Sequence, residues 1–336
     1  MFIQSKPFIQ ARLLRVSTLV IQTDASLFGW GAVFMDTNTQ GRWNIEESQC
    51  HINVLELKAI YFALKALCRN LSDVHLCVRT DSSVAVAYIN KKGGSVISLH
   101  TITKDIWLWC YERNIYISAV HIAGKENVEP DNLSRIFNDS SEWMLKPEIF
   151  TEICSHFFKP EIDLFSSRLN HQVEKYVSWF PDPEAFATDA FSFSWKNLKP
   201  YLFPPFSVIP RVLMKLEDDQ VKNALLIAPL WQTQFWFPKL MESLIEIPIQ
   251  LPFCKDLLVL PFTQKFHPMN KRKLFLTACL VSGDISLRKA FHESLQTSYQ
   301  ILGDHQPTNN INMHGINGVF GVFRNKSIPL HLLQRT

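Results

Sequence analysis

Residues 18–137 predict an α/β fold in which a mixed β-sheet is flanked by helices, and the following residues predict a second, smaller α/β domain. Between residues 18 and 136, short β-type runs alternate with amphipathic helical periods. From residue 143 the sequence becomes rich in Pro and Trp, and apolar runs alternate with loops that Pro interrupts. With 336 residues, 47% of them hydrophobic, the chain is long and apolar enough for two folded domains.

The first domain opens with three β-type runs, which Gly, Asn and Asp turn residues separate: 18–26, 29–35 and 41–47. They predict an antiparallel meander. A helix follows, with Asn53 as its expected N-cap and Glu56 in a capping-box position. The remaining periods predict a strand over 74–80, helices over 82–90 and 98–113, and a last strand over 115–122.

Composition changes along the chain predict six segments. They are an N-terminal extension (1–17), the first domain (18–137), a polar linker (138–142), the second domain (143–260), a helical tail (261–303) and a disordered end (304–336). Within the tail, residues 271–280 and 286–301 are the expected helices.

Charge and cysteine content exclude several classes of protein. The net charge of +3 does not by itself indicate a nucleic-acid-binding protein, and seven cysteines without a CxxC pair suggest neither a disulfide framework nor a zinc site. The sequence has no run of about 20 apolar residues and no signal peptide. We therefore expect an intracellular protein, in the nucleus or cytoplasm, that is neither secreted nor bound to a membrane.

Four acidic residues stand where strands or helices begin or end: Asp24, Glu56, Asp81 and Asp131. Each alone can be a turn former or a helix cap. If a sheet brings them to one edge, however, their mutual repulsion requires cations, and Mg²⁺ prefers such oxygen ligands. Two such ions about 4 Å apart can activate a water and stabilise the leaving oxygen in phosphodiester cleavage.

The same four residues lie in four motif blocks: TDASLFGWGAVF, HINVLELKAIYFAL, VRTDSSVAVAYINKKGG and HIAGKENVEPDNLSR. In order and spacing these resemble the blocks of type 1 ribonuclease H, in the form fused to reverse transcriptase in DIRS-like tyrosine-recombinase retrotransposons. The resemblance covers about residues 18–136.

This resemblance implies a five-stranded ribonuclease H fold that cuts the RNA strand of an RNA/DNA hybrid with two Mg²⁺ ions, for which Mn²⁺ is the expected substitute. Asp24 would bridge both ions, Glu56 and Asp81 would hold one, and Asp131 would complete the other. Gly29 and Gly31 would keep the entry to the second strand free of side-chain bulk.

The sequence departs from the family pattern in two places. The loop 124–130 lacks the His that assists product release in cellular members, and His121 belongs to the preceding strand. The long basic handle helix is also missing. Lys91 and Lys92 are the expected phosphate contacts in its place, and Lys125 is a candidate in the loop.

About residues 155–240 resemble the segment that follows ribonuclease H in DIRS-like elements and, more distantly, phage-type Dam adenine methyltransferases. The positions that carry this resemblance are Asp163, Asn170, Trp195, Phe203, Pro204, Pro205 and Phe206. Phe203 has no polar atom to accept a hydrogen bond from the target amine, and no glycine-rich turn follows 162–165. We therefore expect a degenerate methyltransferase-like scaffold without methyl transfer.

The resemblance also implies a fragment of a retroelement polyprotein whose other parts, a reverse transcriptase and a tyrosine recombinase, are its expected partners. Residues 1–17 would then be the remnant of the reverse transcriptase connection. Two alternatives to a nuclease stay open. One is a catalytically inactive nucleic-acid-binding module from a decayed element, and the other is a DNA-modifying enzyme that acts through residues 143–260.

Overall fold

The computed structural model describes residues 18–137, 143–267, 274–297 and 317–333. The chain divides into two compact units, the first of which contains the described residues up to 137 together with Phe180–Glu184. The second unit contains the other described residues. The expected N-terminal extension (1–17) and linker (138–142) lie outside the described residues.

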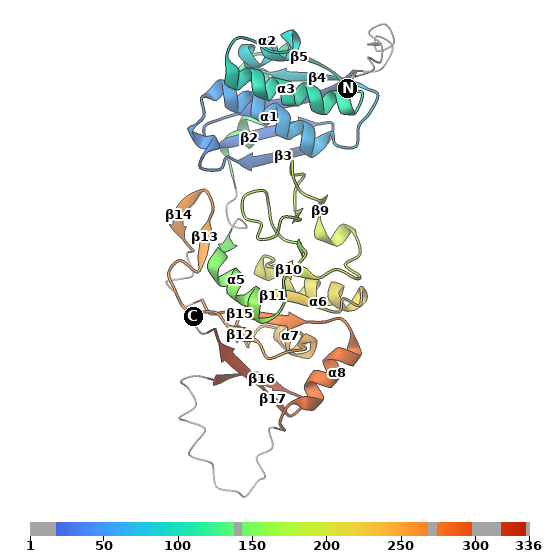
Figure 1. Cartoon of the computed structure of the whole chain (residues 1–336), viewed down its shortest axis with the longest axis vertical. Coiled ribbons are helices and arrows are strands. Elements are labelled where there is room, and N and C mark those ends of the chain that lie inside the picture. The colour runs from blue at the N-terminus through green and yellow to red at the C-terminus, as the bar shows by residue number, and fades with distance from the viewer. Residues whose placement is uncertain (1–17, 138–142, 268–273, 298–316, 334–336) are drawn as a thin grey trace, which may run out of the picture. The chain divides into compact units, whose positions relative to one another are not determined.

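The first unit is built on a five-stranded sheet with the order β3-β2-β1-β4-β5 (Figure 1). β1, β2 and β3 form an antiparallel meander, whereas β1, β4 and β5 run parallel. This strand order with these directions is that of the ribonuclease H fold, so the predicted fold class is confirmed for this unit. The strands are β1 (Thr18–Ala25), β2 (Gly29–Phe34), β3 (Thr37–Arg42), β4 (His75–Thr80) and β5 (Tyr116–His121).

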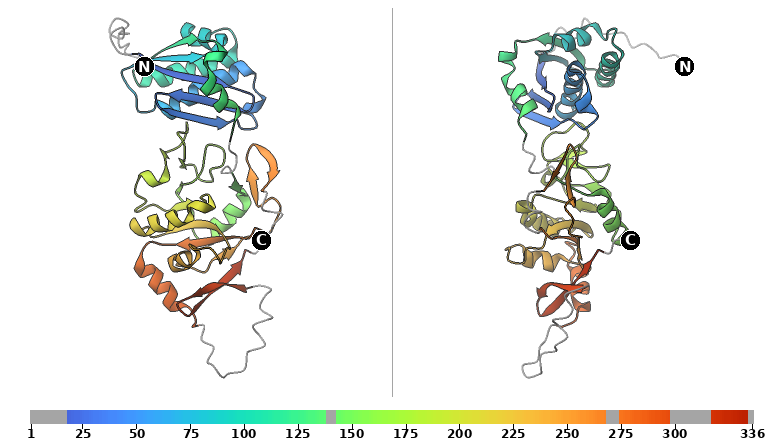
Figure 2. Two further views of the ribbon diagram at one scale, coloured as in Figure 1. Left: turned by 180° about the vertical axis from the view of Figure 1, so that it is seen from behind. Right: turned by 90° about the vertical axis from the view of Figure 1, so that its left-hand side faces the viewer.

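Helices cover both faces of this sheet. Figure 1 shows α1 and α3 side by side over one face, and α4 crosses the other face in the rear view of Figure 2. The alternation of β2 explains this arrangement, because Trp30 packs edge-on against Phe62 of α1, whereas a Cβ on Gly31 would lie 2.5 Å from Leu133 of α4. The helices are α1 (Ile52–Leu67), α2 (Ser83–Lys91), α3 (Ile97–Glu112) and α4 (Val128–Arg135).

Two local predictions in the first unit are wrong. The third strand is Thr37–Arg42 and not 41–47, because Met35 takes a left-handed φ of 53° and the chain turns back immediately after Phe34. The N-cap of α1 is His51 and not Asn53, since the His51 ring accepts a hydrogen bond from the Asn53 amide at 3.2 Å. Glu56 is therefore five residues past the cap, and its carboxylate is not a capping-box group.

The second unit contains a seven-stranded sheet with the order β16-β17-β12-β15-β11-β10-β7. β7, β10 and β11 run parallel, and β15 pairs antiparallel with both β11 and β12. The strands are β7 (Ile162–Asp163), β10 (Pro200–Leu202), β11 (Ala224–Pro229), β12 (Ile249–Gln250), β15 (Leu276–Val281), β16 (Asn317–Phe323) and β17 (Lys326–Leu332).

Four α-helices and five short strands complete the described part of this unit. The helices are α5 (Pro147–His156), α6 (Ile209–Asp218), α7 (Phe237–Ser243) and α8 (Ile285–Ser294). The short strands are β6 (Met144–Leu145), β8 (Val177–Ser178), β9 (Ala187–Thr188), β13 (Leu258–Leu260) and β14 (Thr263–Phe266). In the described part of the chain, no helix is both long and apolar enough to span a bilayer.

The structure corrects the predicted extent of the second domain. The unit continues past residue 260, because β13 pairs with β14 and because β15 lies between β11 and β12. It is therefore the longer of the two units and not the smaller. Residues 276–280 of the expected helix 271–280 instead belong to β15, whose six side chains are all buried. A short apolar run of this kind does not distinguish a buried helix from a buried strand.

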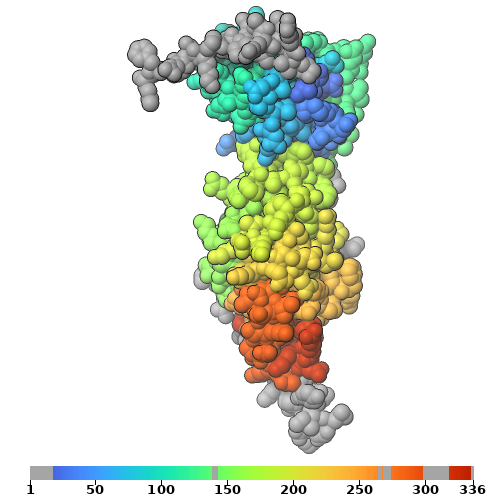
Figure 3. All heavy atoms as spheres, turned by 90° about the vertical axis from the view of Figure 1, so that its right-hand side faces the viewer, coloured from blue at the N-terminus to red at the C-terminus, as the bar shows by residue number. Residues whose placement is uncertain are grey.

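The predicted disorder of 304–336 is wrong for residues 317–332, which form the β16–β17 hairpin. Arg324 and Asn325 take left-handed φ values of 47° and 63°, the conformation that two-residue hairpin turns require. Figure 3 shows α8 (orange) beside this hairpin (red), and Lys326 Nζ donates to the Leu295 carbonyl just after α8 at 2.8 Å. The first half of the expected helix 286–301 is α8. Residues 298–316 lie outside the described residues.

Candidate active site

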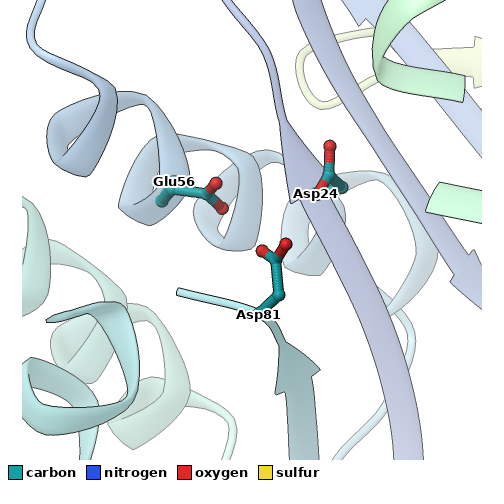
Figure 4. A group of neighbouring side chains, drawn as sticks. All are labelled: Asp24, Glu56 and Asp81. Carbon is teal, nitrogen blue, oxygen red and sulfur yellow. The ribbon is translucent and has the colours of Figure 1, made fainter. Parts of the chain in front are cut away.

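Three of the four predicted acidic residues converge at one edge of the first sheet. Asp24, Glu56 and Asp81 each offer a carboxylate oxygen, and these oxygens all lie within 4.8 Å of one another. Figure 4 shows the carboxyl groups of Glu56 and Asp81 directed toward Asp24. The topology explains this, because β1 and β4 are parallel neighbours in the register Gln22↔Arg79, so the residues at their carboxyl ends meet. Glu56 reaches the same point from α1.

Burial makes this cluster electrostatically unfavourable without a cation. Asp24 and Glu56 are only 3% and 6% exposed, while Asp81 is more accessible. Burial, followed by repulsion from Asp24 and Asp81, raises the pKa of Glu56 to about 9, despite a hydrogen bond from the Ala25 backbone. Burial is also the main cause that raises the pKa of Asp24 to about 6, and the negative charges of Asp81 and Asp131 add to it.

The donor set fits a hard divalent cation. In the described part of the chain, Glu56 Oε2 is buried without a hydrogen-bond partner, and its carboxyl group is directed at the other two (Figure 4). Buried carboxylate oxygens are otherwise expected to be paired, whereas Mg²⁺ takes several such ligands together with water. The three carboxylates can therefore hold an ion that replaces their missing charge compensation.

Asp131, the fourth predicted acidic residue, is not part of this close cluster. It lies within α4 and does not precede it. Its Oδ1 accepts a hydrogen bond from Arg135 Nε at 2.7 Å and forms an ion pair with Arg135 Nη2 at 2.7 Å. Its charge nevertheless contributes to the raised pKa of Asp24, so it stands near the cluster. In this structure a guanidinium is the counter-ion of Asp131.

A pocket of about 350 Å³ opens over the cluster and carries both charged and apolar side chains. The exposed Leu27 and Phe28 form part of its wall. The turn that bears them is held by Ser26, whose hydroxyl accepts from the Phe28 amide and donates to the Ser134 carbonyl. The pocket is lined by Asp24, Ala25, Ser26, Leu27, Phe28, Ile52, Glu56, Asp81 and Arg135.

Two residues that orient Asp24 were not predicted from the sequence. Ser134 Oγ donates to Asp24 Oδ2 at 2.7 Å, and Asn127 Nδ2 donates to Asp24 Oδ1 at 3.3 Å. Both lie in the block HIAGKENVEPDNLSR, at the two ends of α4. Their positions on either side of Asp131 were the only sequence feature that pointed to them. The pairing itself could not be read from the sequence, because Asp24 is more than 100 positions away.

The predicted phosphate contacts lie on the surface of the same unit. Lys91 ends α2, and Lys92 follows in a left-handed conformation (φ 61°), with its Nζ 5.0 Å from the Trp107 ring centroid. Lys125 is exposed in a 3₁₀ turn, Gly124–Glu126. A Cβ on Gly124 would lie 3.3 Å from Asp81 Oδ2, so this loop passes directly beside the cluster. His121 is exposed at the end of β5.

In the second unit, the methyltransferase-like positions gather at the carboxyl ends of adjacent parallel strands. Asp163 ends β7, and Phe203-Pro204-Pro205-Phe206 follows β10. Asp163 is buried, which raises its pKa to about 6, and it accepts hydrogen bonds from the amides of Phe165 and Gln172.

The remaining contacts of these positions stabilise the unit's own loops. Asn170 Oδ1 accepts from the Ser167 amide at 2.6 Å, and the buried Trp195 donates to the Ala190 carbonyl at 2.6 Å. The Phe206 ring packs edge-on against Trp231. These contacts are structural, and the methyltransferase-like character remains a prediction.

Comparison with known proteins finds similarity over part of the chain. No protein-family model matches the chain. The enzymatic polyproteins of Cauliflower mosaic virus strains D/H and Strasbourg are each 31% identical to it over 135 residues, which covers 36% of this chain. The match spans only 19% of the length of these curated relatives.

Solved structures of ribonucleases H1 are also similar to part of the chain. LC11-RNase H1, solved with an RNA/DNA hybrid, is 24% identical, with a TM-score of 0.31, and the match covers 34% of this chain and 92% of that protein. RNase H1 from Halobacterium salinarum is 19% identical, with a TM-score of 0.28, and the match covers 35% of this chain and 94% of that protein. The order and directions of the strands, and not these scores, define the first unit as a ribonuclease H-like α/β unit.

Proposed function

We propose that the first unit hydrolyses the RNA strand of RNA/DNA hybrids with the help of two Mg²⁺ ions. The observation that carries this proposal is the convergence of Asp24, Glu56 and Asp81 within 4.8 Å at the carboxyl ends of two parallel strands. The buried, unpaired Glu56 Oε2 supports a role as a cation ligand and argues against a role in packing.

In this proposal each acidic side chain has a distinct part. Asp24 would contribute to both cation positions, Glu56 and Asp81 would hold one cation, and Asp131 would help to hold the other once released from Arg135. When bound, the ions activate the attacking water and stabilise the leaving oxygen of the phosphodiester. Leu27 and Phe28 contribute apolar surface to the wall of the pocket in which the phosphodiester would lie.

Substrate binding would use the surface around the pocket. Lys91, Lys92 and Lys125 are exposed and are the proposed phosphate contacts, and Lys92 is held over the Trp107 ring. An RNA strand would be distinguished by its 2′-hydroxyls in a wide minor groove. The similarity to a viral enzymatic polyprotein supports a retroelement origin, in which a reverse transcriptase and a tyrosine recombinase would be the partners.

The experiment is incubation of the purified chain with three duplexes of one sequence: RNA/DNA, RNA/RNA and DNA/DNA. We expect Mg²⁺-dependent cleavage of the RNA strand of the hybrid alone. Retained affinity for the hybrid without any cleavage would favour the inactive nucleic-acid-binding module instead.

A further inference from the structure

The carboxylate of Asp24 is hydrogen-bonded at both of its oxygens by one helix. Ser134 Oγ donates to Oδ2 at 2.7 Å, and Asn127 Nδ2 donates to Oδ1 at 3.3 Å. Both donor residues have 0% exposure. The Asn127 amide group also donates to the Thr23 carbonyl at 3.0 Å, so the NH₂ group, and not the oxygen, must face Asp24.

These two donors are themselves held in place by the packing of α4. Asn127 precedes the first residue of α4, and Ser134 lies in its last turn. The Ser134 carbonyl accepts a hydrogen bond from Ser26 Oγ at 2.6 Å, which ties this end of α4 to the turn after β1. At Gly31 a Cβ would come within 2.5 Å of the Pro130 carbonyl, so the absence of a side chain allows α4 to lie close to β2.

The chemistry of the donors determines what they leave available. A carboxylate oxygen has two lone-pair directions, and each oxygen of Asp24 gives one of them to α4. One direction on each oxygen therefore remains. Because a hydroxyl and an amide are neutral, they orient the ionised carboxylate without supplying the positive charge that the cluster lacks. Asp131, in contrast, already has a positively charged partner, Arg135.

We propose that Ser134 and Asn127 are positioning residues that orient Asp24, so that each of its two oxygens faces a separate cation position in the pocket. This inference rests on the proposed two-ion site. It assigns to the two ends of α4 the neutral hydrogen-bond donors that orient an acidic residue of the site.

The test compares Ser134→Ala with Ser134→Thr in the full chain. Ser243→Ala is the matched control, because Ser243 is 2% exposed and donates to a helix carbonyl, Lys239 O, at 2.8 Å. Isothermal titration calorimetry measures Mg²⁺ affinity, thermal melting measures folding, and initial rates on a labelled hybrid give kcat and KM.

We expect Ser134→Ala to weaken Mg²⁺ binding about three- to tenfold and to lower kcat by a similar factor, with KM little changed. Ser134→Thr keeps the hydroxyl and should recover most of both losses, and Ser243→Ala should change neither. Asn127→Ala should weaken Mg²⁺ binding in the same direction.

Two results would overturn the inference. One is wild-type Mg²⁺ affinity and kcat in a folded Ser134→Ala protein, and the other is a folded Ser134→Thr protein as impaired as Ser134→Ala. Failure of the proposed function looks different. If the wild-type chain cleaves no hybrid and Ser134→Ala still weakens Mg²⁺ binding, the positioning role stands and the nuclease proposal fails.

Discussion

Asp24 on β1 and Glu56 on α1 bring carboxylate oxygens within 4.8 Å of each other, although both side chains are more than nine-tenths buried. Two carboxyl groups in such a place cannot both ionise without compensation, which is why the pKa values of both are raised. The relationship links the stability of the first unit to pH and to divalent cations.

Without divalent cations, the stability of the first unit should fall as the pH rises. The pKa of Glu56 is about 9 in the folded chain and near 4.5 when unfolded, so between these values the folded form binds the extra proton. The protonated group favours folding below about pH 5, and this contribution is lost progressively up to about pH 9. Thermal melting in a chelator should show a Tm that declines by several degrees over this window, and Glu56→Gln should flatten the decline. A Tm of the wild-type chain that rises over this window would contradict the assignment.

Mg²⁺ binding at pH 7 should release about one proton. Glu56, with a pKa of about 9, is protonated at this pH and must ionise to become a ligand, whereas Asp24, with a pKa of about 6, is mostly ionised already. Calorimetric titrations in buffers of different ionisation enthalpy measure the number of protons released. Glu56→Gln is the control and should release almost none. An equal binding enthalpy in all buffers for the wild-type chain would exclude Glu56 as a ligand.

Removal of the guanidinium that holds Asp131 should strengthen cation binding. Arg135 donates a hydrogen bond to Asp131 and forms an ion pair with it, and Arg135 lines the same pocket as the three clustered carboxylates. With Arg135→Gln, we expect Mg²⁺ affinity to rise about three- to tenfold, because a competing positive charge is lost. Arg113→Gln is the matched control, since Arg113 lies just after α3, beside Glu112. Unchanged or weaker binding in Arg135→Gln would show that Arg135 does not compete with the cation.

A side chain at Gly31 should disturb the contact between β2 and α4. The added Cβ of Gly31→Ala would lie 2.5 Å from both Leu133 Cβ and the Pro130 carbonyl, so α4 must shift. We expect a loss of about 1–3 kcal/mol in the free energy of unfolding, measured by urea denaturation. Gly318→Ala in β16 is the control, because its nearest side-chain atoms would be 4.0 Å away. Equal stabilities of the two variants would contradict the close packing of α4.

The fold of the first unit could be predicted from sequence because its apolar periods are long and turn residues separate them. The same reasoning failed where the local pattern was ambiguous. Residues 276–281 are apolar except for Thr277, and only their pairing with β11 and β12 makes them a strand. The β16–β17 hairpin depends on its pairing with β12, far away in the sequence.

The acidic residues of the site were predictable, but their partners were not. Asp24, Glu56 and Asp81 mark the ends of local elements, which a sequence pattern reveals. The hydrogen bonds from Asn127 and Ser134 to Asp24 arise only when α4 packs on the sheet. The ion pair of Asp131 with Arg135 spans one helical turn and was visible in principle, as an i,i+4 pair.

The most direct measurement uses one RNA/DNA hybrid, labelled on either strand, with the full chain and its Asp81→Asn variant. We expect the wild-type chain to release only the RNA label in Mg²⁺. We expect no release in chelator or by Asp81→Asn, which should melt no lower than the wild type because one repelling charge is gone. Cleavage that persists in a folded Asp81→Asn protein, or that proceeds equally in chelator, would contradict the carboxylate site.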